Sequence, residues 1–255
     1  MLSILSPSKT LDFDSPVSVT GTTKIPFPDD SQQLASQLAE ATPNALRDLM
    51  GISDSLAELN HQRFQDWEIP TARNGGRPAA CAFQGDVYRG LKTDQWTPKQ
   101  WDYAQDHLRI LSGLYGVLRP KDLMLPYRLE MGTSLKTERG KDLYAFWGDK
   151  VRDRLIKSME TTGAKFLLNL ASQEYLKAIG PKTFPFPIIT PVFKENKDGK
   201  YKMITVFAKV ARGTMASWAI RKKAKTPKKL QTFDADGYRY DAASSKESQP
   251  VFLRG

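Results

Sequence analysis

The sequence predicts a mixed α/β (α+β) fold built as a single domain, and three observations support this. Short apolar runs of strand length alternate with segments that show helical spacing. The chain has 255 residues, of which 40% are hydrophobic and 26% charged, which is an ordinary globular composition. No internal repeat or linker-like stretch divides it. We therefore expect one domain over residues 1–255, large enough to bury a substantial core.

Short apolar runs bounded by polar or turn-forming residues predict the β-strands. These runs are residues 2–5, 79–83, 108–111, 166–170, 188–193 and 202–210. The sequence Asn196-Lys-Asp-Gly199 is typical of a hairpin turn and predicts one between the last two strands.

Helix signals lie between these runs. Thr97 supplies an N-cap and Pro98 a first-turn proline. Leu143, Phe146 and Val151 recur at helical spacing. The predicted helices cover residues 31–41, 98–107, 142–159, 172–179 and 212–225.

Composition excludes several classes of protein. Cys81 is the only cysteine, so no internal disulfide can form, and the residue reads as small core packing. His61 and His107 are the only histidines, and no Cys/His spacing predicts a metal or cofactor site. No run approaches the roughly 20 apolar residues of a membrane helix, and the start lacks a signal peptide's basic region. We expect a cytoplasmic protein without a cofactor or a membrane contact.

Positive charge is concentrated in one segment. The chain carries 38 basic and 28 acidic residues, a net charge of +10. Residues 199–233 contain ten Lys or Arg and no Asp or Glu, so the remainder is neutral, with 28 of each sign. The cluster Arg221, Lys222 and Lys223 is its densest part. Such a segment suits a polyanion such as nucleic acid; a solvated lysine-rich surface is the alternative.

Polar residues follow several predicted strands. Because ligands of open α/β sheets sit beyond the carboxyl ends of strands, we expect these residues to meet in one cleft. The cations are Lys9, Arg128, Lys209 and Arg212, and the expected polar lining is Ser6, Ser112, Tyr115, Asn169, Ser172 and Tyr175. Fixed positive charge, hydroxyl donors and aromatic faces fit a phosphorylated or nucleotide-like ligand. Helix capping and core packing are the alternative roles for the same side chains.

No sharp catalytic signature is present in the sequence: it lacks GxxxxGK[ST], GxSxG, HExxH and a strand-linked GxGxxG. Lys9 and Lys209 are the candidate nucleophile or base. Lysine does that chemistry only where burial or neighbouring cations change its protonation. No catalytic residue is therefore assigned from the sequence.

A helix-hairpin-helix is predicted at about residues 43–67. Two helical segments flank Gly51-Ile52-Ser53, with Pro43 opening the first and Ala57 in register in the second. Such a hairpin exposes backbone N–H groups that hold a phosphate without reading sequence. Ser53 replaces the usual second glycine, and the acidic residues Asp48 and Asp54 disfavour a phosphate nearby. An ordinary αα-hairpin is the alternative.

Taken in order, these motifs resemble one protein family over nearly the full chain. They are Ser6-Pro-Ser-Lys9, Phe83-Gln-Gly-Asp-Val-Tyr88, Leu111-Ser-Gly-Leu-Tyr-Gly-Val-Leu-Arg-Pro120, Tyr127-Arg-Leu-Glu-Met131, Asn169-Leu-Ala-Ser-Gln-Glu-Tyr175, Ala208-Lys-Val-Ala-Arg-Gly213, Gly237-Tyr-Arg-Tyr240 and Val251-Phe-Leu-Arg254. Each is modest alone, but the ordered set is specific, and it is similar to the peroxide stress resistance protein YaaA family.

The resemblance implies a cytoplasmic protein that protects cells from hydrogen peroxide by limiting unincorporated iron. It also implies a single-domain fold of unusual topology with a helix-hairpin-helix and a positively charged cleft, and binding to duplex or structurally distorted DNA. Carried over by position, the hairpin is Gly51-Ile52-Ser53 and the cleft cations are Lys9, Arg128, Lys209 and Arg212. The cluster at residues 221–229 lies outside the matching motifs. Nothing in the sequence looks like an iron site, so we expect the effect on iron and Fenton damage to be indirect.

Besides an interaction protein whose basic tail binds acidic proteins or RNA, two functions stay open at the level of sequence. The first is a DNA-binding stress protein whose affinity falls with salt. The second is an enzyme acting on a small phosphorylated ligand held by Lys9, Lys209 and Arg212.

Overall fold

A central five-stranded sheet organises the molecule. The computed structural model describes residues 1–17 and 19–255. The strand order is β4-β3-β1-β6-β7, with β3, β1, β6 and β7 parallel and β4 antiparallel to β3. The strands are β1 (Leu2–Leu5), β3 (Leu108–Ser112), β4 (Gly116–Leu118), β6 (Leu167–Asn169) and β7 (Ile188–Ile189). Every residue of β1 is buried, as expected of a central parallel strand covered on both faces.

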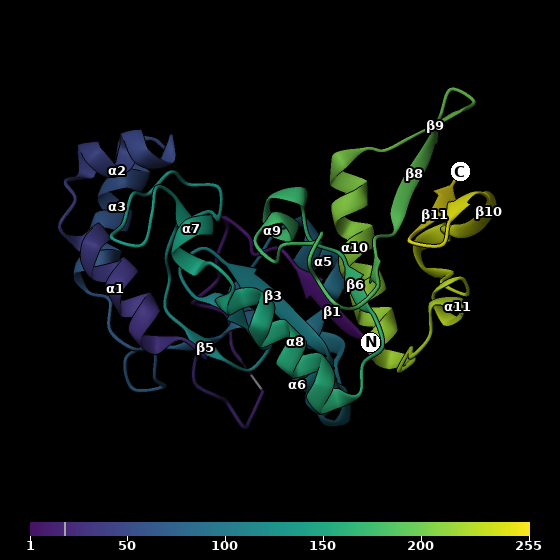
Figure 1. The fold of residues 1–255 in the computed structure, drawn as a ribbon, viewed down its shortest axis with the longest axis horizontal. Helices are drawn as coiled ribbons and strands as arrows, with labels where there is room; N and C mark the ends of the chain where they lie inside the picture. The colour runs from purple at the N-terminus through teal and green to yellow at the C-terminus, as the bar shows by residue number, and fades with distance from the viewer. Residues whose placement is uncertain (18) are drawn as a thin grey trace.

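A second sheet lies at the C-terminal end of the chain (Figure 1). Its order is β10-β11-β8-β9, with β11 and β8 parallel and the outer pairs antiparallel. The strands are β8 (Val192–Lys197), β9 (Lys200–Lys202), β10 (Arg239–Lys246) and β11 (Gln249–Arg254). A third, two-stranded sheet pairs β2 (Arg77–Pro78) with β5 (Leu123–Met124).

Helices surround these sheets. Near the N-terminus come α1 (Pro28–Ala39), α2 (Pro43–Met50), α3 (Asp54–Gln65), α4 (Ala79–Ala82), α5 (Asp86–Leu91) and the 3-10 turn η1 (Thr93–Gln95). The middle of the chain holds α6 (Pro98–His107), α7 (Leu143–Trp147), α8 (Lys150–Thr162) and α9 (Gln173–Lys177). The last are α10 (Thr205–Arg221), α11 (Pro227–Leu230) and the 3-10 turn η2 (Ala235–Gly237). In Figure 1, α1–α3 lie at one end of the molecule and the β8–β9 hairpin at the other.

One continuous hydrophobic core joins these parts, with members from Met1 to Phe252. The mixed α/β prediction is confirmed. Three local predictions are also confirmed: the first strand, the helix at 98–107 with its Thr97 capping box, and the turn between β8 and β9. In that turn Asp198 and Gly199 both have positive φ, which suits a two-residue hairpin loop.

Two predicted strands are wrong. Residues 79–83 are mostly the short helix α4, because three alanines favour helix over strand. Residues 202–210 divide between the end of β9 and the start of α10, so the predicted helix at 212–225 begins earlier, at Thr205. The signal for the longer helix is the spacing of Ala208, Ala211 and Met215, which are all buried.

Two further predictions were too long. The predicted strand at 188–193 separates at Thr190 and Pro191 into β7 and β8, which belong to different sheets. The predicted helix at 142–159 is broken between α7 and α8, where Gly148 takes a φ of 48°. A glycine adopts that left-handed backbone without steric cost, so the helix ends there.

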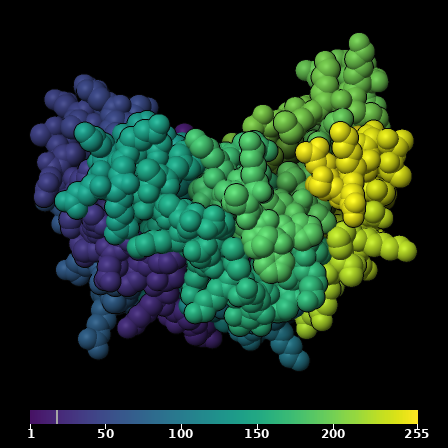
Figure 2. All heavy atoms as spheres, viewed as in Figure 1, coloured from purple at the N-terminus to yellow at the C-terminus, as the bar shows by residue number. Residues whose placement is uncertain are grey.

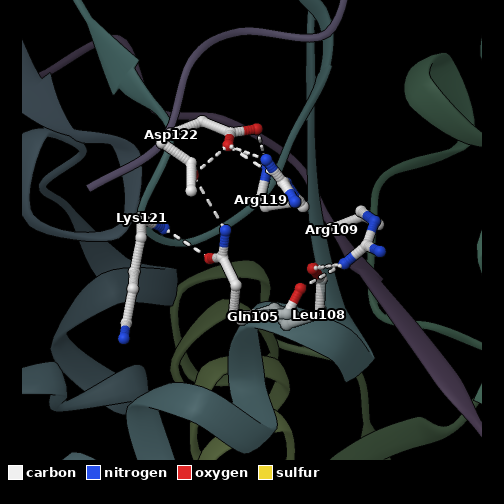
Figure 3. Close-up of polar contacts among 7 residues, drawn as sticks. Gln105, Leu108, Arg109, Arg119, Lys121 and Asp122 are labelled. Carbon is white, nitrogen blue, oxygen red and sulfur yellow. Dashed lines mark hydrogen bonds and ion pairs between the residues drawn. The ribbon is translucent and has the colours of Figure 1, made fainter. Parts of the chain in front are cut away.

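A buried polar network fixes the beginning of β3 (Figure 3). One guanidinium nitrogen of Arg109 donates to the carbonyls of Gln105 at 2.9 Å and Leu108 at 2.7 Å. The Arg119 guanidinium pairs with the fully buried Asp122, with Nη2 3.0 Å from Oδ1. Arg109 thus ties β3 to α6, and the N–H of Lys121, which donates to Gln105 Oε1 at 2.8 Å, ties the turn after β4 to the same helix.

Candidate functional site

A cavity of about 560 Å³ lies beyond the carboxyl ends of β1 and β6. Five segments of the chain line it, within residues 6–10, 85–88, 127–130, 170–175 and 209–212. This is the position at which parallel α/β sheets bind ligands. The structure thus brings together the predicted residues Ser6, Lys9, Arg128, Ser172, Tyr175, Lys209 and Arg212.

Two of the four lining cations share one carboxylate. Lys9 Nζ lies 2.8 Å from Glu130 Oε1, and Arg128 Nη2 lies 3.5 Å from the same oxygen. The Lys9 side chain is 60% exposed, whereas that of Arg128 is 17% exposed. The buried Nε of Arg128 has no hydrogen-bond partner among the described residues. An exposed, ion-paired lysine is suited to carry charge, whereas a nucleophilic lysine needs burial.

The other two cations come from α10. Neither Lys209 nor Arg212 forms an ion pair with any residue in the described ranges 1–17 and 19–255. Arg212 is half-buried, and burial lowers the pKa of its guanidinium from the usual value, although the group stays charged at neutral pH. The sequence predicted these residues at the end of a strand. They instead lie one turn apart on a helix, so they face the cavity together.

Two glycine contacts fix the position of α10. A Cβ on Gly213 would stand 1.7 Å from the carbonyl oxygen of Val87, and one on Gly90 would stand 2.1 Å from that of Val210. The backbones of α5 and α10 therefore touch, as only glycines allow. This close packing holds the Lys209–Arg212 turn beside Asp86 and Val87, which line the same cavity.

The cavity also holds three carboxylates. Glu130 takes the two cations already described, Asp86 pairs with Arg89 at 2.6 Å, and Glu174 Oε1 accepts the N–H of Gly132 at 2.8 Å. The lining is therefore of mixed charge, with four cations against three acids.

Ser112, Tyr115 and Asn169 lie behind the cavity wall and do not line it. The Ser112 hydroxyl is 2.6 Å from that of Tyr127, and it accepts the N–H of Tyr115 at 2.9 Å. Asn169 Oδ1 accepts the N–H of Ala171. All three are buried, and Ser112 and Asn169 accept backbone N–H groups of the turns that follow their strands. They support the wall from behind.

Tyrosines form part of the wall. Tyr88 donates to the carbonyl of Ser6 at 3.0 Å, and Tyr175 accepts the N–H of Met131 at 3.3 Å. Burial raises the pKa of the Tyr88, Tyr127 and Tyr175 phenols well above their usual range. These phenols are therefore neutral at physiological pH and can act as hydrogen-bonding walls.

The segment Gly85–Tyr88 lines the cavity but was not predicted from the sequence as part of the site. Gly85 has a φ of 109°, and a Cβ there would stand 2.8 Å from Ser8 Oγ. The glycine thus lets the start of α5 approach the loop that follows β1. The signal was the Gly-Asp pair directly after Phe83 and Gln84, which is typical of a turn into a helix.

The predicted DNA-binding hairpin is a separate feature of the molecule. Gly51 has a φ of 59° and ends α2, and Ser53 caps α3 by accepting the N–H of Leu56. Arg47 pairs with Asp48 at 2.9 Å and Asp54 at 3.1 Å, so its charge is already neutralised. None of these residues lines the cavity.

The basic segment occupies three places. Lys200 and Lys202 lie on the exposed edge strand β9, Lys209 and Arg212 on the cavity wall, and the remainder from Arg221 to Lys229 around the end of α10 and α11. Arg221 is 12 residues beyond Lys209 on one helix, a rise of about 18 Å. The densest charge is therefore remote from the cavity.

The described part of the chain carries neither a cluster of metal ligands nor a membrane-spanning helix. Within residues 1–17 and 19–255, no three His, Cys, Asp or Glu side chains gather to hold a metal ion. No described helix has the length and apolar character needed to cross a membrane.

The fold and site define a mixed α/β protein with a polar, ligand-sized cavity at the strand ends. The family model described as "Peroxide stress protein YaaA" matches residues 1–244. The chain belongs to this family, as its motifs predict. Among similar proteins, the UPF0246 protein of Saccharophagus degradans is 50% identical over 100% of this chain and 99% of its own length. The UPF0246 proteins of Teredinibacter turnerae and Polynucleobacter necessarius are 50% and 49% identical, again over 100% of this chain, and over 99% and 98% of their own lengths.

Proposed function

We propose that this member of the peroxide stress protein family binds duplex or structurally distorted DNA through the phosphate backbone. The observation that carries the proposal is a set of eight exposed cations on β9 and around the end of α10 and α11: Lys200, Lys202, Arg221, Lys222, Lys223, Lys225, Lys228 and Lys229. No acidic residue lies in the same segment of the chain, residues 199–233. Each phosphate contact by such a cation releases counterions, which favours binding at low salt.

The shape of the molecule supports a preference for bent or branched DNA. Figure 2 shows a hollowed face between the end that carries α2 and α3 and the end that carries the β8–β9 hairpin. Strand β9, which carries Lys200 and Lys202, lies at one of these ends, and the Gly51–Ser53 turn joins α2 to α3 at the other. Contacts at two separated points fit a bent duplex or a junction better than a straight one, because such contacts read shape.

Peroxide protection would then act through the DNA. Bound protein would exclude iron and peroxide from the phosphate backbone, and this limits Fenton damage without requiring an iron site. This indirect route also separates the proposal from iron storage: the purified protein should bind DNA without first being loaded with iron. Tight, stoichiometric iron binding by the purified protein would contradict it.

The experiment is DNA binding as a function of salt, using linear, bubble-containing and four-way-junction DNA of equal length. We expect log K to fall linearly with log salt concentration, and the junction and bubble to bind more tightly than the linear duplex. Affinity that does not change between low and high salt would refute backbone binding. Equal affinity for all three DNAs would refute the shape preference alone.

A further inference from the structure

The cavity differs from the DNA-binding surface in charge, because its lining contains carboxylates as well as cations. A continuous phosphate backbone entering the cavity would meet Glu130 and Glu174 as well as the cations. Like charges in a confined, partly buried site cost free energy, so the cavity is poorly suited to a polyanion. It suits a small molecule with an anionic end and an end that carries hydrogen-bond donors.

The anionic end fits the α10 wall. Lys209 and Arg212 have no carboxylate partner among the described residues, and they lie one helical turn apart. Arg128 has a further donor, its buried Nε, with no partner among the same residues. Charged donors without partners beside a cavity are what a phosphate monoester requires, because charge-assisted hydrogen bonds are stronger than neutral ones.

The end of the ligand that carries hydrogen-bond donors fits the carboxylates and hydroxyls of the lining. Glu130 is held by Lys9 and Arg128, and Glu174 by the N–H of Gly132, so both acids are fixed in position. Carboxylates accept hydrogen bonds from the hydroxyls of a sugar, as they do for ribose in dinucleotide sites. The volume of about 560 Å³ lies within the range of small-molecule sites.

We propose that the cavity binds a small sugar phosphate or nucleoside monophosphate, with its phosphate at Lys209 and Arg212 and its hydroxyls toward Glu130 and Glu174. This binding does not depend on the DNA contact. The site is a second function of the protein, and Arg212 is its main phosphate contact because it is the more buried of the two α10 cations.

The test is calorimetric titration of the purified protein with four probes: adenosine 5′-monophosphate, ribose 5-phosphate, inorganic phosphate and adenosine. We expect at least one of the two phosphate monoesters to bind about tenfold or more tightly than adenosine, because only they offer the charged end. Comparison of the two monoesters distinguishes a nucleotide from a sugar phosphate. The proposal is overturned if neither binds at about 1 mM, the level of weak binding, or if adenosine binds equally well.

Arg212→Gln and Arg221→Gln form a matched pair on one helix. Arg221 lies nine residues, about two and a half turns, further along α10, where it donates to Gln95 at 3.1 Å and does not line the cavity. We expect Arg212→Gln to weaken monophosphate binding about tenfold or more and Arg221→Gln to leave it unchanged. Equal losses would overturn the assignment. If Arg212→Gln fails to fold, Arg212→Lys keeps the charge and should bind with an intermediate affinity.

The last part of the test measures monophosphate binding in the presence of DNA. Saturating linear duplex should leave the affinity for the monophosphate unchanged, because the DNA contacts lie on the outer surface. Displacement of the monophosphate by DNA would overturn a separate ligand site. Loss of DNA binding with monophosphate binding intact would instead refute only the DNA proposal, so the two failures are distinguishable.

Discussion

Gly213 on α10 touches Val87 on α5 so closely that a Cβ on the glycine would stand 1.7 Å from the Val87 carbonyl oxygen. No real side chain tolerates such a contact, and the obstacle is backbone that cannot rotate away. The pair therefore sets the distance between the two helices. Because Val87 and the neighbouring Arg212 both line the cavity, it also sets the width of the site.

We predict that Gly213→Ala destabilises the protein by about 1–3 kcal/mol or more, as expected for overpacking in a rigid contact. The variant should also widen the cavity by pushing α10 away from α5. Urea unfolding measures the loss of stability. The control is Gly199→Asn in the β8–β9 turn, where an added Cβ meets nothing within 4 Å and asparagine tolerates the positive φ. Unchanged stability of Gly213→Ala would show that the helices do not touch there.

The cavity could be predicted in part from the sequence. The residues after β1 and β6 were identified because parallel strands end at one edge of a sheet. The same reasoning could not separate Ser6, which lines the cavity, from Ser112, which is buried behind it. That distinction depends on which side of a turn a side chain takes, and residue type does not determine it.

Lys209 and Arg212 were predicted to lie in the site, but from an incorrect secondary structure. The apolar run ending at Val210 predicts a strand, but its members belong mostly to α10. Short apolar runs fit a strand and a buried helix equally well. The residues still reach the cavity because a one-turn spacing on the helix brings them to the same face. Their location was therefore predicted, whereas the element that carries them was not.

The buried carboxylate of Asp30, in the first turn of α1, should make the stability of the protein depend on pH. Asp30 contacts Arg139 at 2.5 Å and Lys150 at 2.6 Å, and only 6% of the residue is exposed. Burial alone would raise the pKa of Asp30, but the hydrogen bonds from Lys150 and Arg139 outweigh it and lower the pKa below the usual 3.8. The unfolded chain therefore binds this proton more readily than the folded protein does. The stabilisation is complete above about pH 4 and is lost as pH falls through the folded value.

We expect Asp30→Asn to cost about 1 kcal/mol of unfolding free energy at neutral pH, a modest value because both cations are partly exposed. The difference from wild type should shrink as the pH falls below about 4. Urea unfolding across this range measures it, with the exposed neighbour Asp29→Asn as the control. A difference that stays constant from neutral to acid pH would mean that the Asp30 charge contributes nothing.

The separation of the basic segment into distant groups predicts unequal contributions to DNA binding. Lys200 and Lys202 are exposed on edge strand β9, which lies at one end of the hollowed face of Figure 2. If each contacts one phosphate, Lys200→Gln with Lys202→Gln should reduce the slope of log K against log salt by about 2. The control is Lys157→Gln with Lys165→Gln, which removes equal charge from exposed positions in and just after α8. Equal reductions in the two double variants would show that net charge alone, without a defined contact surface, governs the binding.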